Sequence, residues 1–223
     1  MCGRFAFYSP AEAAAALFEF EPGFPTEPRY NIAPTQLIPV VRSARERGRE
    51  LVMLRWGLVP FWAKDPSIGN RMINARAETL AEKPAYRHAY EKRRCLILAD
   101  GFYEWRKQAS GKTPYFISLA SGEPFAFAGL WESWTDRSSG ESLQTTVIVT
   151  AAASPFLEEL HDRMPVVLQP ETASDWLAGK PGALDTVIAS PPRLQVWPVD
   201  CKVNDARNEG LELIQRVGGV SGG

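Results

Sequence analysis

The 223-residue chain has few of the side chains from which proteins commonly build metal sites. It contains three cysteines (Cys2, Cys95 and Cys201) and two histidines (His88 and His161). The cysteines lie far apart and form no C-x-x-C pair, the spacing typical of structural zinc ligands. The sequence therefore predicts a protein that holds no metal and uses no other cofactor.

Long apolar runs and a large net charge are also missing. No apolar stretch reaches the roughly 20 residues of a transmembrane helix, and the start of the chain, polar and then acidic, is unlike a signal peptide. The 25 Lys and Arg residues almost balance 26 Asp and Glu residues, for a net charge of -1. This balance excludes a generally basic nucleic-acid coat, so a nucleic-acid site would have to be a local patch. We expect a cytoplasmic, nucleoid-associated protein with no membrane contact.

Short apolar runs separated by turns predict an α+β domain rich in antiparallel strands. The pattern Ser9-Pro10-Ala11-Glu12 is typical of a capping box that begins a helix. The Gly/Ser-rich residues 218–223 predict a flexible tail. We expect helices over residues 10–20, 81–93, 155–160 and 171–178, and strands over 37–42, 51–56, 95–100, 102–106, 114–119, 125–131, 145–150 and 194–199.

Cys2 offers unusual chemistry because it follows Met1, and a small second residue permits an aminopeptidase to remove the methionine. Cys2 would then carry an α-amine and a thiol, with reference pKa values of about 8 and about 8.5. The amine can condense with an aldehyde to a Schiff base, and the thiol can then close a five-membered thiazolidine. Taken alone, Cys2 fits equally a small second residue without chemical consequence.

Two further segments carry polar groups. Asn74, Arg76 and Glu78 alternate with alanines, so an extended chain would point all three to one face. This face could be a polar site in which Arg76 binds a phosphate, or a solvated strand edge. Glu104 stands among aromatic residues, which would desolvate its carboxyl and favour a protonated general acid; the alternative is a surface glutamate. Trp105 could stack on a base or fill the core.

His161 lies in a loop between a predicted helix and a predicted strand, where it could carry protons or be structural. His88, on a charged helix, is expected to be solvated. The segment 29–35 combines Arg29, Tyr30 and Asn31 in a turn. Such a segment could contact single-stranded nucleic acid or form an ordered loop.

Eight short motifs together resemble the SOS response-associated peptidase (SRAP) family, over a region from Cys2 to about residue 215. The resemblance implies a single SRAP-type domain over residues 1–217, with an α+β, mainly antiparallel, barrel-like fold and peripheral helices. The motifs are M-C-G-R-F (1–5), R-Y-N-I-A-P (29–34), W-G-L-V-P (56–60), I-N-A-R-A-E-T (73–79), A-D-G-F-Y-E-W (99–105), T-A-A-A (150–153), H-D-R-M-P (161–165) and V-N-D (203–205).

The resemblance also implies a function: covalent capture of abasic sites in single-stranded DNA by a mature N-terminal Cys2, with a thiazolidine as the product. Lyase-type activity and self-removal of Met1 belong to the same expectation, as does a monomeric state. The implied catalytic residues are Cys2, Asn74, Glu104 and His161. The implied DNA-binding residues are Arg4, Asn31, Arg76, Trp105 and Arg163.

Two other functions remain open on the sequence. Glutamine amidotransferases also begin Met-Cys-Gly, so an N-terminal-nucleophile amidohydrolase or peptidase is the alternative enzyme, although the rest of such a domain's pattern is missing. The non-enzymatic alternative is a single-stranded DNA-binding module in which Cys2 is incidental.

Overall fold

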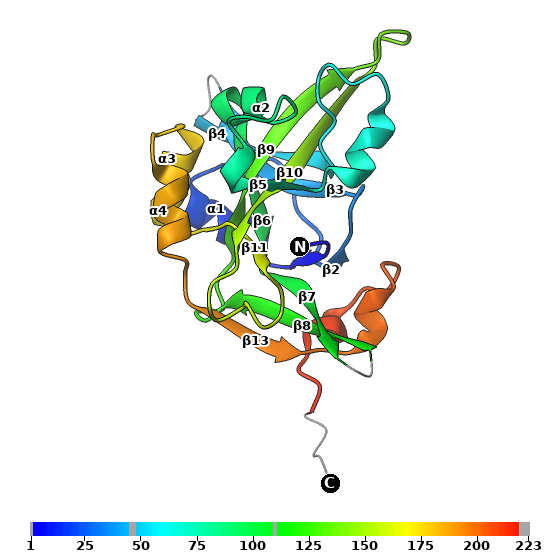
Figure 1. Cartoon of the computed structure of the whole chain (residues 1–223), viewed down its shortest axis with the longest axis vertical. Helices are drawn as coiled ribbons and strands as arrows, with labels where there is room; N and C mark the ends of the chain where they lie inside the picture. The colour runs from blue at the N-terminus through cyan, green and yellow to red at the C-terminus, as the bar shows by residue number, and fades with distance from the viewer. Residues whose placement is uncertain (1, 45–47, 109–110, 219–223) are drawn as a thin grey trace.

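A five-stranded closed barrel forms the larger part of the fold (Figure 1). The computed structural model describes residues 2–44, 48–108 and 111–218. Around the barrel, β3 pairs with β4 and β6, β6 with β9, β9 with β10, and β10 with β4. The β4–β10 pair is parallel and the other four are antiparallel. The barrel strands are β3 (Leu37–Ala44), β4 (Gly48–Trp56), β6 (Arg94–Ala99), β9 (Phe125–Thr135) and β10 (Ser142–Ala152). The expected α+β, barrel-like and mainly antiparallel fold is confirmed.

Three short strands extend the barrel. β5 (Asn74–Arg76) pairs in parallel with β10, and β11 (Arg163–Pro165) pairs with β10 antiparallel. β12 (Val167–Leu168) pairs with β9. Since β5 and β11 both bond to β10, segments almost 90 positions apart in the sequence lie near each other at one end of that strand.

A second, antiparallel sheet lies below the barrel in Figure 1. A single residue, Asp100, separates its strand β7 from β6 of the barrel. Phe5 of this sheet contacts Trp56 and Phe127 of the barrel edge-on, with ring centroids 5.3 and 5.6 Å apart. The start of the chain therefore lies where the second sheet packs against the barrel. The strand order is β13 (Leu194–Pro198), β8 (Gly111–Leu119), β7 (Gly101–Gln108), β1 (Phe5–Phe7) and β2 (Arg29–Ile32).

Helices pack at the periphery. Trp176 is fully buried and donates a hydrogen bond from Nε1 to the Cys95 carbonyl at 2.9 Å, which fixes α3 on β6. Cys95 is buried as expected. None of the helices in the described part of the chain is long and apolar enough to cross a bilayer. The helices are α1 (Ala11–Phe18), α2 (Arg87–Lys92), α3 (Pro170–Leu177) and α4 (Ala183–Ala189), with 3-10 turns η1 (Pro66–Arg71), η2 (Ala77–Thr79), η3 (Cys201–Asn204) and η4 (Leu211–Ile214).

The expected capping box at residues 9–12 is wrong. The Ser9 hydroxyl donates to Asp100 Oδ1 at 2.5 Å, and the amides of Tyr8 and Ser9 donate to Asp100 Oδ2 at 2.6 and 2.8 Å. The buried carboxylate between β6 and β7 therefore positions the entry to α1, so Ser9 does not cap the helix.

Of two further expected helices, the one over residues 155–160 is wrong and the one over residues 81–93 is too long. Residues 155–160 form separate turns, because bonds from Glu158 to Ser154 and from His161 to Leu157 do not join into a continuous ladder. The helix expected over 81–93 is confined to 87–92. Pro84 disfavours helical geometry in the residue before it, which agrees with the late start. Most of the predicted tail, residues 219–223, lies outside the described residues.

Candidate active site around Cys2

Cys2 is completely buried and lies three residues before β1 begins at Phe5. Asn74 Nδ2 on β5 donates a hydrogen bond to the Cys2 carbonyl at 2.8 Å. The Cys2 thiol donates to the Arg4 carbonyl at 3.7 Å, and that carbonyl also accepts the Tyr103 amide of β7 at 3.0 Å. Groups from the barrel and from the second sheet thus hold Cys2 from two sides.

Glu104 lies on β7 with only 5% of its surface exposed. Burial raises the pKa of the Glu104 carboxyl, and the charge of His161 acts in the opposite direction. Burial also raises the pKa of the Cys2 thiol, and the Glu104 carboxylate raises it further. The fold therefore brings Glu104 within electrostatic range of both Cys2 and His161, although the three residues are far apart in the sequence.

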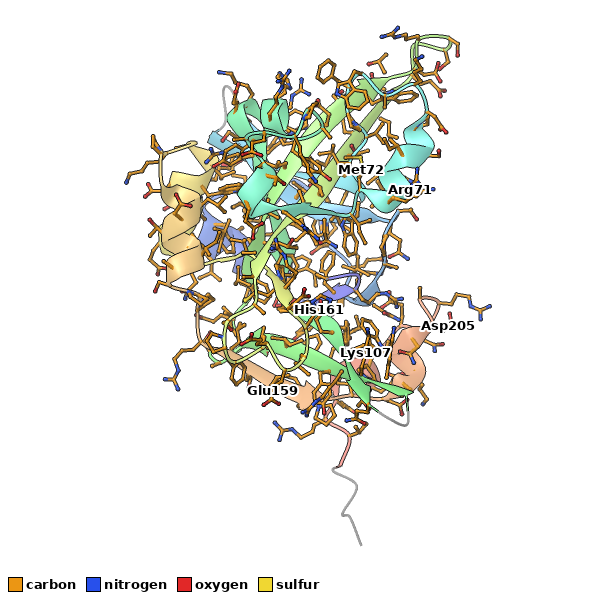
Figure 2. The ribbon with its side chains drawn as sticks, viewed as in Figure 1. Arg71, Met72, Lys107, Glu159, His161 and Asp205 are labelled. Carbon is orange, nitrogen blue, oxygen red and sulfur yellow. The ribbon has the colours of Figure 1, made fainter. Side chains whose placement is uncertain are left out.

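His161 precedes β11 and is about one-third exposed, at 32% of its side-chain surface. In the view of Figure 2 it lies near the middle of the face, between Met72 on the barrel side and Lys107 on the sheet side. Its Nδ1 is 3.0 Å from the Arg163 amide nitrogen and 2.7 Å from Asp162 Oδ1. A single ring nitrogen cannot accept from the first and donate to the second at once, so the position of the proton selects the partner.

The polar face expected from residues 74–78 is only partly right. Asn74 and Arg76 flank the buried Ala75 on β5, as the alternation predicts. Glu78 does not continue the strand, because β5 ends at Arg76 and η2 begins at Ala77. The exposed Arg76 side chain is thus the cation of this segment that faces solvent.

Arg163 is held by protein groups. Its Nη1 and Nη2 donate to the two carboxylate oxygens of Glu78 at 2.6 and 3.0 Å, and Nη2 also donates to the Thr150 carbonyl at 2.6 Å. The Arg163 side chain is only 14% exposed. This bidentate pair was not evident from the sequence, because Glu78 and Arg163 come together only when β5 and β11 both pair with β10.

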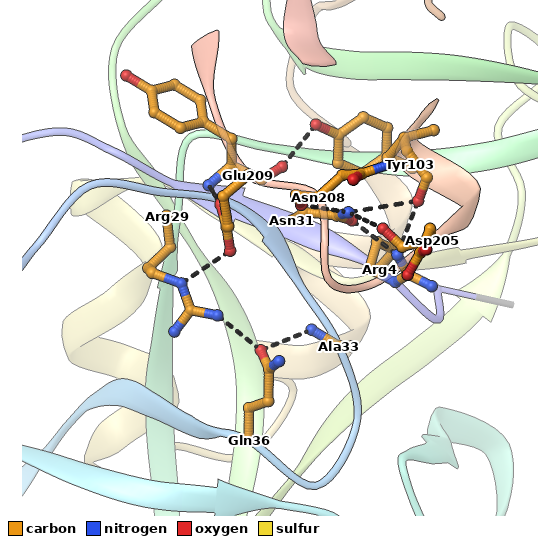
Figure 3. Close-up of polar contacts among 11 residues, drawn as sticks. Arg4, Arg29, Asn31, Ala33, Gln36, Tyr103, Asp205, Asn208 and Glu209 are labelled. Carbon is orange, nitrogen blue, oxygen red and sulfur yellow. Dashed lines mark hydrogen bonds and ion pairs between the residues drawn. The ribbon is translucent and has the colours of Figure 1, made fainter. Parts of the chain in front are cut away.

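Arg4 and Asn31 fasten the segment 203–208 onto the second sheet (Figure 3). Arg4 Nη1 donates to Asn31 Oδ1 at 2.7 Å and to the Val203 carbonyl at 2.8 Å. Asn31 Nδ2 donates to the carbonyls of Asp205 and Asn208, each at 2.9 Å. Asn31 is fully buried, so it offers DNA no exposed surface in this conformation. Any effect of Asn31 on DNA would pass through the position of this segment.

Trp105 lies apart from Glu104. Adjacent residues of a strand face opposite sides of the sheet, and Trp105 packs in the cluster that contains Tyr103. Its Nε1 donates to Asn204 Oδ1 at 2.7 Å, which joins the indole to the 203–208 segment. The structure therefore groups Arg4, Asn31 and Trp105 around this segment. Asn74 and Glu104 form a second group around Cys2, with His161 near Glu104.

Replacement of Asn31 by alanine should lower the free energy of unfolding by about 2–3 kcal/mol, because several buried polar groups lose their partner. Urea denaturation measures this effect. Asn208→Ala is the matched control: its exposed side-chain amide donates to the Lys202 carbonyl, and we expect a loss below about 1 kcal/mol. Equal stability of Asn31→Ala and the unsubstituted protein would show that the amide does not fasten the segment.

Metal chemistry has no visible support in the described residues, which contain no group of three or more His, Cys, Asp or Glu side chains suited to a metal ion. The site is instead one of a buried thiol, a carboxyl with raised pKa, an amide and an imidazole. Such a set suits nucleophilic chemistry assisted by proton transfer.

This barrel with its buried Cys2 is that of the SOS response associated peptidase (SRAP) family: the family model matches residues 1–206, and the chain belongs to the family. Among its relatives is "Abasic site processing protein YoaM" of Bacillus subtilis (strain 168), which is 40% identical over 96% of this chain and 97% of the relative. "Abasic site processing protein YedK" of Escherichia coli (strain K12) is 35% identical over 97% of this chain and 100% of its own. The resemblance predicted from the motifs is confirmed.

Solved structures agree with this fold. A protein from Bacteroides thetaiotaomicron superposes with a TM-score of 0.85 at 23% identity, covering 97% of this chain and 100% of that one. A phage-related protein from Bordetella bronchiseptica superposes with a TM-score of 0.69 at 31% identity, covering 89% of this chain and 94% of that one.

Proposed function

We propose that this protein captures abasic sites in single-stranded DNA by forming a thiazolidine between the lesion's aldehyde and Cys2. The observation that carries the proposal is the buried Cys2 with Asn74 bonded to its carbonyl and Glu104 beside its thiol, while His161 lies within electrostatic range of Glu104. The names of the relatives YoaM and YedK, abasic site processing proteins, support the choice of substrate. A cytoplasmic location and a monomeric state are part of the same proposal.

The chemistry needs an acid near the nucleophile. An abasic deoxyribose is mostly a closed hemiacetal, so a proton transfer must first open the ring and expose the aldehyde at C1′. The Cys2 amine then adds to this carbon, and water leaves with a proton supplied by Glu104 or His161. The thiol adds to the resulting iminium carbon and closes the ring, which protects the strand from β-elimination.

Asn74 is suited to orient the amine. Its Nδ2 holds the Cys2 carbonyl, while its Oδ1 is buried and accepts no hydrogen bond within the described part of the chain. A buried acceptor of this kind costs free energy unless a donor arrives. After removal of Met1, the α-amine of Cys2 would be such a donor. Because the raised pKa of the thiol keeps it protonated near pH 7, the amine acts first in this scheme.

The DNA would run past the two groups of residues described above. Arg76 is exposed and can bind a phosphate, and Arg163 could do so by exchanging Glu78 for a phosphate. Arg4 and Asn31 would act through the 203–208 segment, while Trp105 would supply an aromatic surface beside it. A single strand suits the site because a lesion must reach a fully buried residue.

A denaturing gel tests the proposal. Purified protein, shown by mass spectrometry to lack Met1, is mixed with a single-stranded oligonucleotide treated with uracil glycosylase. We expect a shifted band that survives denaturation and is absent with the intact oligonucleotide. The absence of a band would reject covalent capture. Equal affinity for the abasic and the intact oligonucleotide would then favour a simple DNA-binding module. Glutaminase activity would instead favour an amidohydrolase.

Replacement of Arg76 by alanine should weaken binding and make it less dependent on salt. Each phosphate contact to a single strand contributes about 0.7 to the slope of log affinity against log salt concentration. Fluorescence anisotropy at several salt concentrations measures this slope. Arg137→Ala removes an exposed arginine beyond β9 and should leave the slope unchanged. An unaltered slope for Arg76→Ala would remove Arg76 from the phosphate contacts.

A further inference from the structure

The ring of His161 has two competing partners on the same nitrogen. The Arg163 amide, 3.0 Å from Nδ1, favours the neutral tautomer that carries its proton on Nε2. The Asp162 carboxylate, 2.7 Å from Nδ1, favours the tautomer that carries its proton on Nδ1. Only the second tautomer leaves Nε2 able to take up a proton and give it back.

The backbone around the His161 ring is well anchored. The Arg163 amide and the Asp162 carboxylate therefore compete for Nδ1 without a rearrangement of the chain. Arg163 is bound to Glu78 and to the Thr150 carbonyl, and the His161 amide donates to the Leu157 carbonyl at 3.1 Å. The Arg163 amide can hardly move away from the ring. Asp162 is 85% exposed at its side chain, and it makes its contact with the ring from the solvent side.

We infer that Asp162 is a positioning residue that holds His161 as the Nδ1–H tautomer, with Nε2 as the nitrogen that exchanges protons during capture. This inference rests on the proposed function for its consequence in catalysis. In the neutral ring, Nδ1–H donates to Asp162 and Nε2 holds a lone pair. Proton uptake at Nε2 gives the imidazolium, and transfer of that proton to the departing hydroxyl of the lesion restores the same neutral tautomer.

Two other carboxylates lie near the ring, on β7 and in the turns before His161. Glu104 on β7 is electrostatically coupled to His161, and Arg106, two residues further on the same strand, pairs with Glu159 at 3.1 Å. In the described residues, Asp162 is the carboxylate whose ion pair with His161 is made at Nδ1. This contact resembles the way a carboxylate orients the histidine of a hydrolase triad, although here the carboxylate is exposed.

The tautomer can be measured directly, because the chain has only two histidines. Long-range ¹H–¹⁵N NMR spectra of histidine-labelled protein, at a pH where the rings are neutral, distinguish the two tautomers, and a His88→Gln sample assigns the signals. We expect Nδ1–H to predominate in the unsubstituted protein. In Asp162→Asn the Arg163 amide should prevail and change the tautomer ratio about twofold to fivefold, the range for an exposed ion pair.

Rescue and control variants separate positioning from general charge. Asp162→Glu should restore most of the Nδ1–H form, whereas Glu158→Gln, an exposed carboxylate in the preceding turns, should change nothing. An Nε2–H ring in the unsubstituted protein, or identical spectra for Asp162→Asn, would overturn the inference. The rate of crosslinking should fall in proportion to the fraction of rings that carry the proton on Nδ1. If the unsubstituted protein forms no crosslink, the proposed function fails while the spectra still decide the role of Asp162.

Discussion

Cys2→Ala should form no denaturant-stable adduct with an abasic single strand. The substitution keeps the α-amine and removes the sulfur, so a Schiff base can still form but cannot close to a thiazolidine. The expected loss on a denaturing gel is complete. Because alanine also permits removal of Met1, the two proteins differ in the thiol alone. Borohydride, which reduces an imine to a stable amine, should restore a band in this variant.

Cys201→Ala is the matched control for this experiment. Cys201 is exposed and unpaired, so it is the cysteine best placed for adventitious reaction with an aldehyde. The variant should crosslink like the unsubstituted protein. A full band from Cys2→Ala without borohydride would reject Cys2 as the residue that stores the adduct. No band from Cys2→Ala even with borohydride would reject the amine as the first nucleophile.

Glu104→Gln should slow adduct formation by about 100-fold while leaving DNA binding nearly intact. Burial raises the pKa of the Glu104 carboxyl, so a larger share of it is protonated near neutral pH than of an exposed glutamate. Loss of a positioned general acid typically costs about 100-fold to 10,000-fold in rate, and we expect His161 to retain part of the proposed proton transfer. Single-turnover gels across a pH series measure the effect.

The pH series makes the test of Glu104 specific. A protonated acid loses activity as pH rises through its pKa, so the unsubstituted protein should slow on the alkaline side. Glutamine cannot ionise, and the variant should lack this limb of the profile. Glu123→Gln, at an exposed turn between β8 and β9, should reproduce the unsubstituted profile. Equal rates for Glu104→Gln and the unsubstituted protein would remove Glu104 from the acid role.

The long strands were predictable because their apolar runs are unmistakable. The run Cys95–Ala99, buried on both faces, lies in β6, and the later strands 114–119, 125–131 and 145–150 each fall within an observed strand. The short strands were missed, because three or four residues such as Phe5–Phe7 are too few to show a period. The closure of the barrel rests on the parallel β4–β10 pair, which no local pattern indicates.

The site was only partly predictable for a related reason. Each segment around Cys2, Asn74, Glu104 and His161 had an ordinary alternative explanation, and their convergence depends on pairings such as β5–β10 and β1–β7. The family resemblance linked these segments to one another, because no periodic pattern in the sequence does so. The separation of Trp105 from Glu104 was foreseeable from the two-residue period of a strand. The burial of Asn31 was not, because its partners lie more than 170 positions away along the chain.

The place of β1, inside the second sheet and against the barrel, has a consequence for the timing of synthesis. Cys2 is synthesised before the residues proposed to assist it, which stand at positions 74, 104 and 161. Domains generally fold as units, so β1 docks against β7 only after much of the chain has emerged. Aminopeptidase could therefore reach Met1 on the nascent chain before Cys2 is enclosed. In the proposed reaction, the aminothiol would meet its acid and its orienting amide later, when the completed fold brings them together.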